Sequence, residues 1–147
     1  MPMSLIENRK ARFNYELLEQ MEAGLDLTGG EVKALRTGQG SLEGAHIAIR
    51  GNEAFLIGAH IPPYQPKNQA GYDPERARRL LLTKDQIKEL MGIEQTKKLT
   101  IVPLSVYNKG RFLKLSLAKA RGKKKGDKRE TIKKRDVERD LRRSLTS

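Results

Sequence analysis

Two hairpin patterns constrain the fold of this 147-residue chain more than any other feature. Residues 46–57 contain two short apolar runs separated by Gly51-Asn52, and a two-residue connection of this kind predicts a tight β-hairpin. Residues 98–117 repeat the pattern with longer arms, and we expect Asn108-Lys109-Gly110 to form the turn. Pro103 lies inside the first of these arms, which predicts an edge position or a bulge. Four strands are therefore expected.

Two short helices are predicted by their N-terminal caps. Thr28 and Glu31 have the spacing of a capping box, and glycines at positions 38 and 40 should end the segment that follows. Thr83 and Gln86 repeat this spacing, and Gly92 lies at the expected end of the second helix. Each helix should have two to three turns.

Residues 13–23 are ambiguous, because their apolar residues fit both a helix and a strand. Tyr15, Leu18 and Met21 lie at helical spacing, whereas Phe13, Tyr15 and Leu17 alternate as in a strand. The propensities of Leu, Glu, Gln and Met favour a helix. Residues 62–74 hold four prolines and a glycine, so we expect a surface loop there.

Strands dominate these expectations, helices are few, and glycine or proline turns recur. This combination is typical of a mainly β domain, a small barrel or sandwich with accessory helices. Among small barrels that bind nucleic acid, the OB-type barrel is the commonest, and it is the fold we expect.

Positive charge is concentrated at the C-terminal end of the chain. The formal net charge is +12, and residues 118–143 contribute +8 of it through thirteen basic and five acidic residues. The composition shifts at Lys119, which predicts a packed domain over residues 1–120 and a basic tail over residues 121–147. Concentrated positive charge favours nucleic acid as the partner, because each phosphate that Lys or Arg neutralises releases a counterion.

Several other classes of protein are disfavoured. The chain has no cysteine, which excludes disulfides and thiolate metal sites, and no apolar run of the ~20 residues that a membrane span needs. His46 and His60 have no carboxylate at metal-ligand spacing beside them, and Glu43 and Lys124 interrupt the two glycine motifs that bind phosphate in nucleotide enzymes. We therefore expect a cytoplasmic protein without catalytic activity, metal or cofactor.

Two basic segments of the body are candidate RNA contacts. Arg76, Arg78 and Arg79 precede an apolar triplet, and anchored arginines present planar forks that suit phosphate; the alternative is a solvated loop with surface ion pairs. Residues 8–12 lead into Phe13 and Tyr15, a combination that suits RNA; the alternative is a frayed N-terminus with two core aromatics. With seven aromatic residues and no Trp, the chain favours a structured RNA recognised by shape and phosphate contacts.

Ordered sequence blocks run through the chain from about Asn8 to Arg135. They are N-R-K-A-R at 8–12, E-A-G-L at 22–25, G-x-E-V-K-x-L-R-x-G at 29–38, E-A-F-L-I-G-A-H-I at 53–61, D-P-x-R-x-R-x-L-L-L at 73–82, and L-A-K-A-R-G-K-K-K-G-D-K-R from residue 117. Their order and spacing resemble the SmpB family, the small protein B or transfer-messenger-RNA-binding proteins of bacterial trans-translation.

The resemblance implies an OB-fold barrel of antiparallel strands with two or three short flanking helices, and it makes residues 13–23 a strand. It also implies binding to the tRNA-like domain of transfer-messenger RNA, where the protein stands in for the missing anticodon arm. The alanine-charged RNA would then be delivered to stalled ribosomes for rescue and peptide tagging. Alanyl-tRNA synthetase and elongation factor Tu would be indirect partners through the shared RNA, and the protein would act as a monomer.

The family's RNA-facing positions map onto Asn8, Glu22 and Leu81, and the Glu22 carboxylate would accept a hydrogen bond from a base edge or a 2′-OH. The surrounding basic residues expected to contact phosphate are Arg9, Arg12, Lys33, Arg36, Arg76, Arg78 and Arg79.

The resemblance also gives the tail a role, in which it is disordered when free and folds as a helix in the decoding centre and the empty messenger channel. The tail residues expected to contact the ribosome are Lys123, Lys124, Asp127, Lys128, Arg129, Ile132 and Lys133. Many relatives carry His or Tyr directly before D-K-R, able to stack on a base of the decoding centre, whereas this chain has Gly126.

Two other functions compete with this interpretation. A ribosomal or assembly protein would thread its basic tail permanently into ribosomal RNA and would need no second RNA. An RNA-processing enzyme would require turnover, for which the residues give no support.

Overall fold

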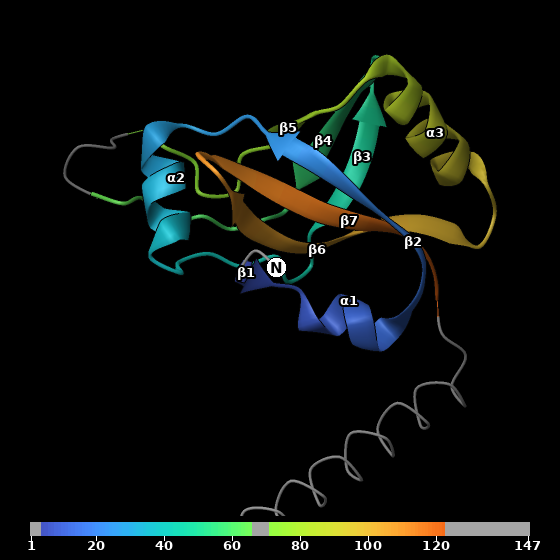
Figure 1. The fold of residues 1–147 in the computed structure, drawn as a ribbon, viewed down its shortest axis with the longest axis horizontal. Helices are drawn as coiled ribbons and strands as arrows, with labels where there is room; N and C mark the ends of the chain where they lie inside the picture. Colours follow the sequence, from blue (N-terminus) through green and yellow to red (C-terminus); the bar gives the residue numbers. More distant parts are fainter. Residues whose placement is uncertain (1–3, 66–70, 123–147) are drawn as a thin grey trace, which may run out of the picture.

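The computed structural model describes residues 4–65 and 71–122, and this part of the chain forms one β-sheet with three helices (Figure 1). In chain order the elements are β1 Ser4–Glu7, α1 Arg9–Asn14, β2 Tyr15–Leu25, α2 Gly29–Arg36, β3 His46–Arg50, β4 Glu53–Ile57, β5 Arg78–Leu81, α3 Lys84–Gln95, β6 Leu99–Lys109 and β7 Phe112–Gly122.

The seven strands pair in the order β1-β6-β7-β2-β5-β4-β3, and every pairing is antiparallel. Over residues 4–65 and 71–122, the two edge strands β1 and β3 do not pair with each other, so hydrogen bonds do not close the sheet. Strand β3 instead lies against β6. The arrangement is open and OB-like, and it confirms the expected mainly β fold with short flanking helices.

Both predicted hairpins are present. The β3–β4 turn is Gly51-Asn52, with φ of +56° and +63°, as a tight two-residue turn requires. The predicted turn of the second hairpin was too early, because Lys109 still pairs with Phe112 and the turn consists of Gly110-Arg111. Gly110 has a φ of +63°, a conformation that glycine adopts without steric cost.

Pro103 lies at a bulge, as expected from its missing amide hydrogen. The β6–β7 register shifts between Pro103 and Ser105, and β1 begins to pair with β6 only at Ser105. The bulge reverses the alternation of side chains along β6. Ile101 before the bulge and Val106 after it therefore both point into the core.

Residues 13–23 are mostly a strand, as the family resemblance implied and against their helical propensity. β2 begins at Tyr15, and only Phe13 and Asn14 belong to the short helix α1. Pairing of β2 with β7 along most of its length outweighs the weak intrinsic preference of its residues.

Both capping boxes are present. The Thr28 hydroxyl accepts from the Glu31 amide at 3.2 Å, and the Thr28 amide donates to Glu31 Oε1 at 2.9 Å. Thr83 and Gln86 repeat these contacts at the start of α3. The prediction that this helix ends at Gly92 was wrong: it continues to Gln95, because Leu90 and Ile93 pack into the core on either side of the glycine.

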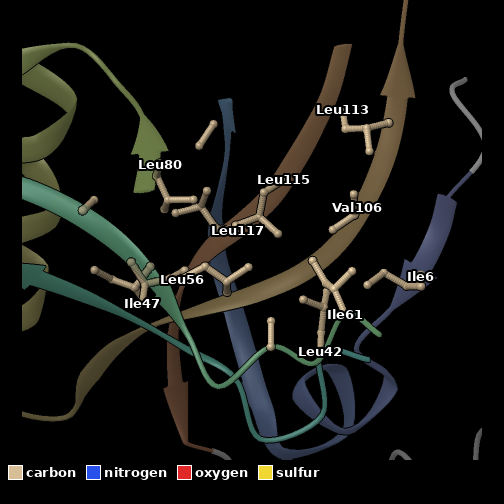
Figure 2. Packing of buried hydrophobic residues seen from close by; sticks show 14 of the residues in the cluster. Ile6, Leu42, Ile47, Leu56, Ile61, Leu80, Val106, Leu113, Leu115 and Leu117 are labelled. Carbon is tan, nitrogen blue, oxygen red and sulfur yellow. The ribbon is translucent and has the colours of Figure 1, made fainter. Parts of the chain in front are cut away.

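The main core lies on one face of the sheet, where α2 and α3 cover it. Figure 2 shows Leu80 of β5 turned toward Leu115 and Leu117 of β7. We call this the inner face and the opposite side the outer face. A smaller cluster lies on the outer face, where Ala11 of α1 packs against β6 and β7; its buried members are Ala11, Val102, Leu104, Ala118 and Ala120.

The described parts of the expected loop, residues 62–65 and 71–74, lie outside helices and strands, as predicted. None of the helices in the described part of the chain has the length and apolar character to span a membrane.

Candidate nucleic-acid interface

The outer face carries polar and charged side chains from three adjacent strands. Alternation along β7 turns its leucines into the core and therefore turns the intervening side chains outward, among them Phe112, Lys114 and Ser116. The register places Ser116 beside Glu22 of β2, and Lys114 beside Tyr107 of β6. The three longest strands thus bring residues from distant parts of the sequence onto one surface.

Glu22 lies on this face and is held by two residues of β6. The Tyr107 hydroxyl donates a hydrogen bond to Glu22 Oε2, and Lys109 Nζ lies 2.9 Å from Oε1 and 3.2 Å from Oε2. The hydrogen bond from Tyr107, followed by that from Lys109, lowers the pKa of Glu22. Glu22 is therefore ionised at neutral pH and can only accept hydrogen bonds.

Tyr107 is the complementary donor. Burial, reinforced by the hydrogen bond to Glu22, raises the pKa of the Tyr107 hydroxyl, so it keeps its proton. A carboxylate has about four acceptor positions, and the contacts with Tyr107 and Lys109 use three of them. Glu22 can therefore accept one further hydrogen bond in a fixed direction.

A shallow depression of about 400 Å³ lies beside Glu22. It brings together two predicted RNA-contacting residues, because Arg12 of α1 and Glu22 of β2 both line it. The complete lining is Ser4, Arg12, Gln20, Glu22, Ser105, Tyr107, Lys109 and Ser116. The lining has two cations, one carboxylate and several small polar side chains. Because positive charge is in excess, the depression suits a sugar-phosphate backbone.

Asn8 anchors the helix α1 that borders this surface. Its Oδ1 accepts from the Ala11 amide at 3.2 Å and its Nδ2 donates to the Pro103 carbonyl at 2.9 Å, which fixes the start of α1 on the bulge of β6. The expected direct contact of Asn8 with RNA does not fit this geometry, because the side chain is buried and its amide already has partners. The exposed Arg9 and the depression-lining Arg12 are the α1 residues that Asn8 positions.

Leu81 and Arg79 extend the outer face onto β5. Leu81 is 49% exposed and lies over Gly24, where an added Cβ would approach the Leu81 Cβ to 3.0 Å. Arg79 lies between two exposed carboxylates, 3.6 Å from Asp26 and 3.4 Å from Glu53. Exposed ion pairs of this kind are weak, so a phosphate can compete for Arg79.

Arg78 points into the protein, which corrects the expectation that three neighbouring arginines face phosphate. Alternation along β5 turns Arg78 inward and Arg79 outward. The fully buried Arg78 guanidinium donates to the carbonyl oxygens of Ala59 and Pro74 at 2.7 and 2.8 Å, and to Glu31 Oε2 at 2.9 Å. Arg78 therefore has a structural role.

Glu31 is the counter-ion of both Arg78 and Arg76. Its Oε2 accepts from Arg76 Nε at 3.0 Å and lies 2.9 Å from the Tyr72 hydroxyl. Burial by itself raises the pKa of Glu31, but hydrogen bonds from Arg76, the Thr28 amide and Arg78 outweigh it and lower the pKa to about 2. These four side chains, Glu31, Tyr72, Arg76 and Arg78, form what we call the Glu31 cluster, which joins α2 to β5 and to the segment before it.

The two predicted site residues of α2 are exposed, and neither lines the depression beside Glu22. Lys33 Nζ lies 5.8 Å from the centre of the Tyr64 ring. Arg36 Nη2 donates to the Arg111 carbonyl at 2.9 Å, which ties α2 to the β6–β7 turn.

The predicted ribosome-contacting residues lie within 123–147, outside the described residues, so the interpretation of the tail stays a prediction. Strand β7 continues to Gly122, two residues beyond the predicted end of the packed domain, and Gly122 pairs with Tyr15.

Sequence reasoning missed Tyr107, Lys109 and Lys114 as members of the candidate interface. The available signal is the alternation within residues 98–117, which separates buried leucines from outward-facing polar residues. In the described ranges 4–65 and 71–122, no group of three His, Cys, Asp or Glu side chains could hold a metal ion.

Comparison with known proteins gives consistent matches. The family model described as SmpB protein matches residues 5–147. The SsrA-binding protein of Gloeothece citriformis is 47% identical over 142 residues, 96% of this chain and 92% of the relative. The SsrA-binding protein of Burkholderia lata is 48% identical over 144 residues, 97% of each chain.

The SsrA-binding protein of Mesoplasma florum is 51% identical over 133 residues, 90% of this chain and 89% of the relative. A solved structure described as "tmRNA-SmpB: a journey to the center of the bacterial ribosome" matches the fold with a TM-score of 0.68 and 41% identity, over 86% of this chain and 92% of that chain. With sequence, fold and the candidate interface in agreement, this chain belongs to the SmpB family.

Proposed function

We propose that the protein binds the tRNA-like domain of transfer-messenger RNA through the outer face of its sheet. It then delivers the alanine-charged RNA to stalled ribosomes for rescue and peptide tagging, and stands in for the missing anticodon arm. The observation that carries this proposal is Glu22, an ionised acceptor fixed by Tyr107 and Lys109 beside a basic, polar depression. The relatives, which are SsrA-binding proteins, support the choice of RNA.

Contacts within the interface divide into two kinds. Glu22 accepts a hydrogen bond from a base edge or a 2′-OH, which depends on the identity and shape of the RNA. Cationic side chains contact phosphates and set affinity without reading sequence; the predicted set, without the buried Arg78, is Arg9, Arg12, Lys33, Arg36, Arg76 and Arg79. Leu81 supplies an apolar contact on the same face.

On the ribosome, the basic tail enters the decoding centre and the empty messenger channel and becomes helical there. Alanyl-tRNA synthetase and elongation factor Tu meet the protein only through the shared RNA. The protein acts as a cytoplasmic monomer, by binding and not by catalysis.

The first test is to sequence the RNA that copurifies with the full-length protein from cells. One abundant RNA with a tRNA-like end is the expected result. A broad mixture of ribosomal RNA would favour the competing interpretation of a permanent ribosomal or assembly protein.

The second test replaces Glu22 by Gln and measures affinity for the tRNA-like domain and for an unrelated RNA duplex. A hydrogen bond to a charged group contributes about 1.5–3 kcal/mol, so Glu22→Gln should weaken binding to the tRNA-like domain about tenfold or more. Affinity for the duplex should not fall. The matched control is Glu16→Gln, since Glu16 is an exposed, ion-paired carboxylate on the same strand. Equal losses on both RNAs would contradict the role of Glu22 in recognition.

A further inference from the structure

Phe112 is a prominent apolar feature of the outer face that the proposed contacts leave unused. It is 70% exposed, more than any other large hydrophobic side chain in the described residues. Single exposed apolar residues are common on protein surfaces, so exposure alone identifies no site. The position of the Phe112 ring and the charges around it are what indicate a binding role.

The ring is held on a rigid part of the fold. Phe112 begins β7 directly after the turn and pairs with Lys109 of β6, so it has the backbone of a regular strand. The hydrogen bond from Arg36 to the Arg111 carbonyl, at 2.9 Å, braces the turn against α2. Figure 1 shows this end of the hairpin beside α2. The backbone that presents the ring is therefore already ordered before a ligand packs on it.

The surroundings of the ring are cationic. Lys109 and Lys114 lie on the same face as the ring, and Arg111 directly precedes it in the turn, where its carbonyl accepts from Arg36 of α2. The chain has no acidic residue between positions 95 and 126, and Glu22 on this face is already paired with Lys109. Centres of protein–protein interfaces are depleted in charged residues, and a membrane surface needs a wider apolar face, so this setting favours a polyanion.

We propose that Phe112 is a platform on which an unpaired RNA base stacks, while Arg111 and Lys114 contact the phosphates on either side of it. A flat ring between cations is the arrangement that binds single-stranded nucleotides in other RNA-binding proteins. The inference rests on the proposed function and adds a second contact, next to Glu22 on the outer face. Transfer-messenger RNA and ribosomal RNA can both supply an unpaired base, so the experiment has one arm for each.

The first measurement compares full-length Phe112→Leu and Phe112→Trp with the wild type. Leucine keeps an apolar side chain without a flat ring, whereas tryptophan keeps the stacking surface. Stacking on one base predicts that Phe112→Leu binds the tRNA-like RNA, or vacant ribosomes, at least about fivefold more weakly, and that Phe112→Trp binds like the wild type. The control Leu18→Ala removes another exposed apolar side chain and should leave both affinities unchanged.

The second measurement identifies the contacted nucleotide. A photoreactive phenylalanine analogue is placed at position 112, and crosslinks are mapped with the tRNA-like RNA and, separately, with ribosomes. A crosslink to an unpaired nucleotide in either arm is the expected result. Crosslinks only to protein or to base-paired nucleotides would overturn the proposal, as would wild-type affinity of Phe112→Leu in both arms. Failure of the wild type to bind the tRNA-like RNA would instead overturn the proposed function.

Discussion

Replacing Glu31 by Gln tests the contribution of the Glu31 cluster to stability. Glutamine has nearly the same shape and can still accept the hydrogen bond from the Thr28 amide. It removes the negative charge that faces Arg78, whose side chain is fully buried, and Arg76, which is 32% exposed. The substitution therefore leaves a buried guanidinium without its counter-ion.

The expected loss of stability follows from the burial of this ion pair and from the lowered pKa of Glu31. Removing one partner of a buried ion pair costs about 3–5 kcal/mol of the free energy of unfolding. The pKa of Glu31 is lowered from 4.5 to about 2, and at 1.36 kcal/mol per pKa unit the ionised form contributes about 3 kcal/mol. Because the folded-state pKa is lowered, this contribution is complete above the unfolded value near 4.5 and is lost as the pH falls toward about 2.

The assay is urea unfolding of the full-length protein, followed by circular dichroism between pH 7 and pH 2.5. Glu31→Gln should lose about 3 kcal/mol at pH 7, and the difference from the wild type should shrink as the pH falls, because protonated Glu resembles Gln. The control Glu53→Gln breaks an exposed pair with Arg79 and should lose less than about 1 kcal/mol. A loss below 1 kcal/mol for Glu31→Gln, or a difference independent of pH, would refute this reasoning.

Three further predictions concern the interface and the tail. Tyr107→Phe removes the hydroxyl that donates to Glu22, so the pKa of Glu22 should rise in a carbon-13 NMR titration, and an unchanged pKa would contradict the assigned hydrogen bond. Arg79→Ala should weaken binding to different RNAs alike and reduce the slope of log affinity against log salt concentration by about one. Arg78→Ala should mainly lower the urea midpoint of unfolding, because Arg78 is fully buried. Equal unfolding midpoints for the two variants would count against the buried role of Arg78. A chain ending at Gly122 should bind the tRNA-like domain normally but fail to support peptide tagging on stalled ribosomes, and tagging by this chain would show that the tail is dispensable.

Features with local sequence signals could be predicted. The Gly51-Asn52 turn and the capping boxes at Thr28 and Thr83 depend on residues no more than three positions apart, and all are present. The end of α3 could not be read locally, because the burial of Leu90 and Ile93 overrides the helix-ending tendency of Gly92.

The candidate interface depends on strand register, which sequence alone did not fix. Arg76, Arg78 and Arg79 form one basic run in sequence, but strand alternation turns only Arg78 into the protein. Tyr107 and Glu22 are 85 residues apart, and only the two pairings of β7 bring them together. Family resemblance identified Glu22 as a site residue, but it gave no partner for its carboxylate.

The long pairing of β2 with β7 affects how the protein folds during its own synthesis. Tyr15 pairs with Gly122 and Gly24 with Lys114, whereas β5 pairs only with the last two residues of β2. The principal partner of an early strand is therefore the last described strand to be made, and such non-local pairs form slowly. Until β7 emerges, β2 keeps an unpaired edge of the kind that promotes aggregation. A product released before residue 112 lacks β7 altogether and cannot complete the sheet.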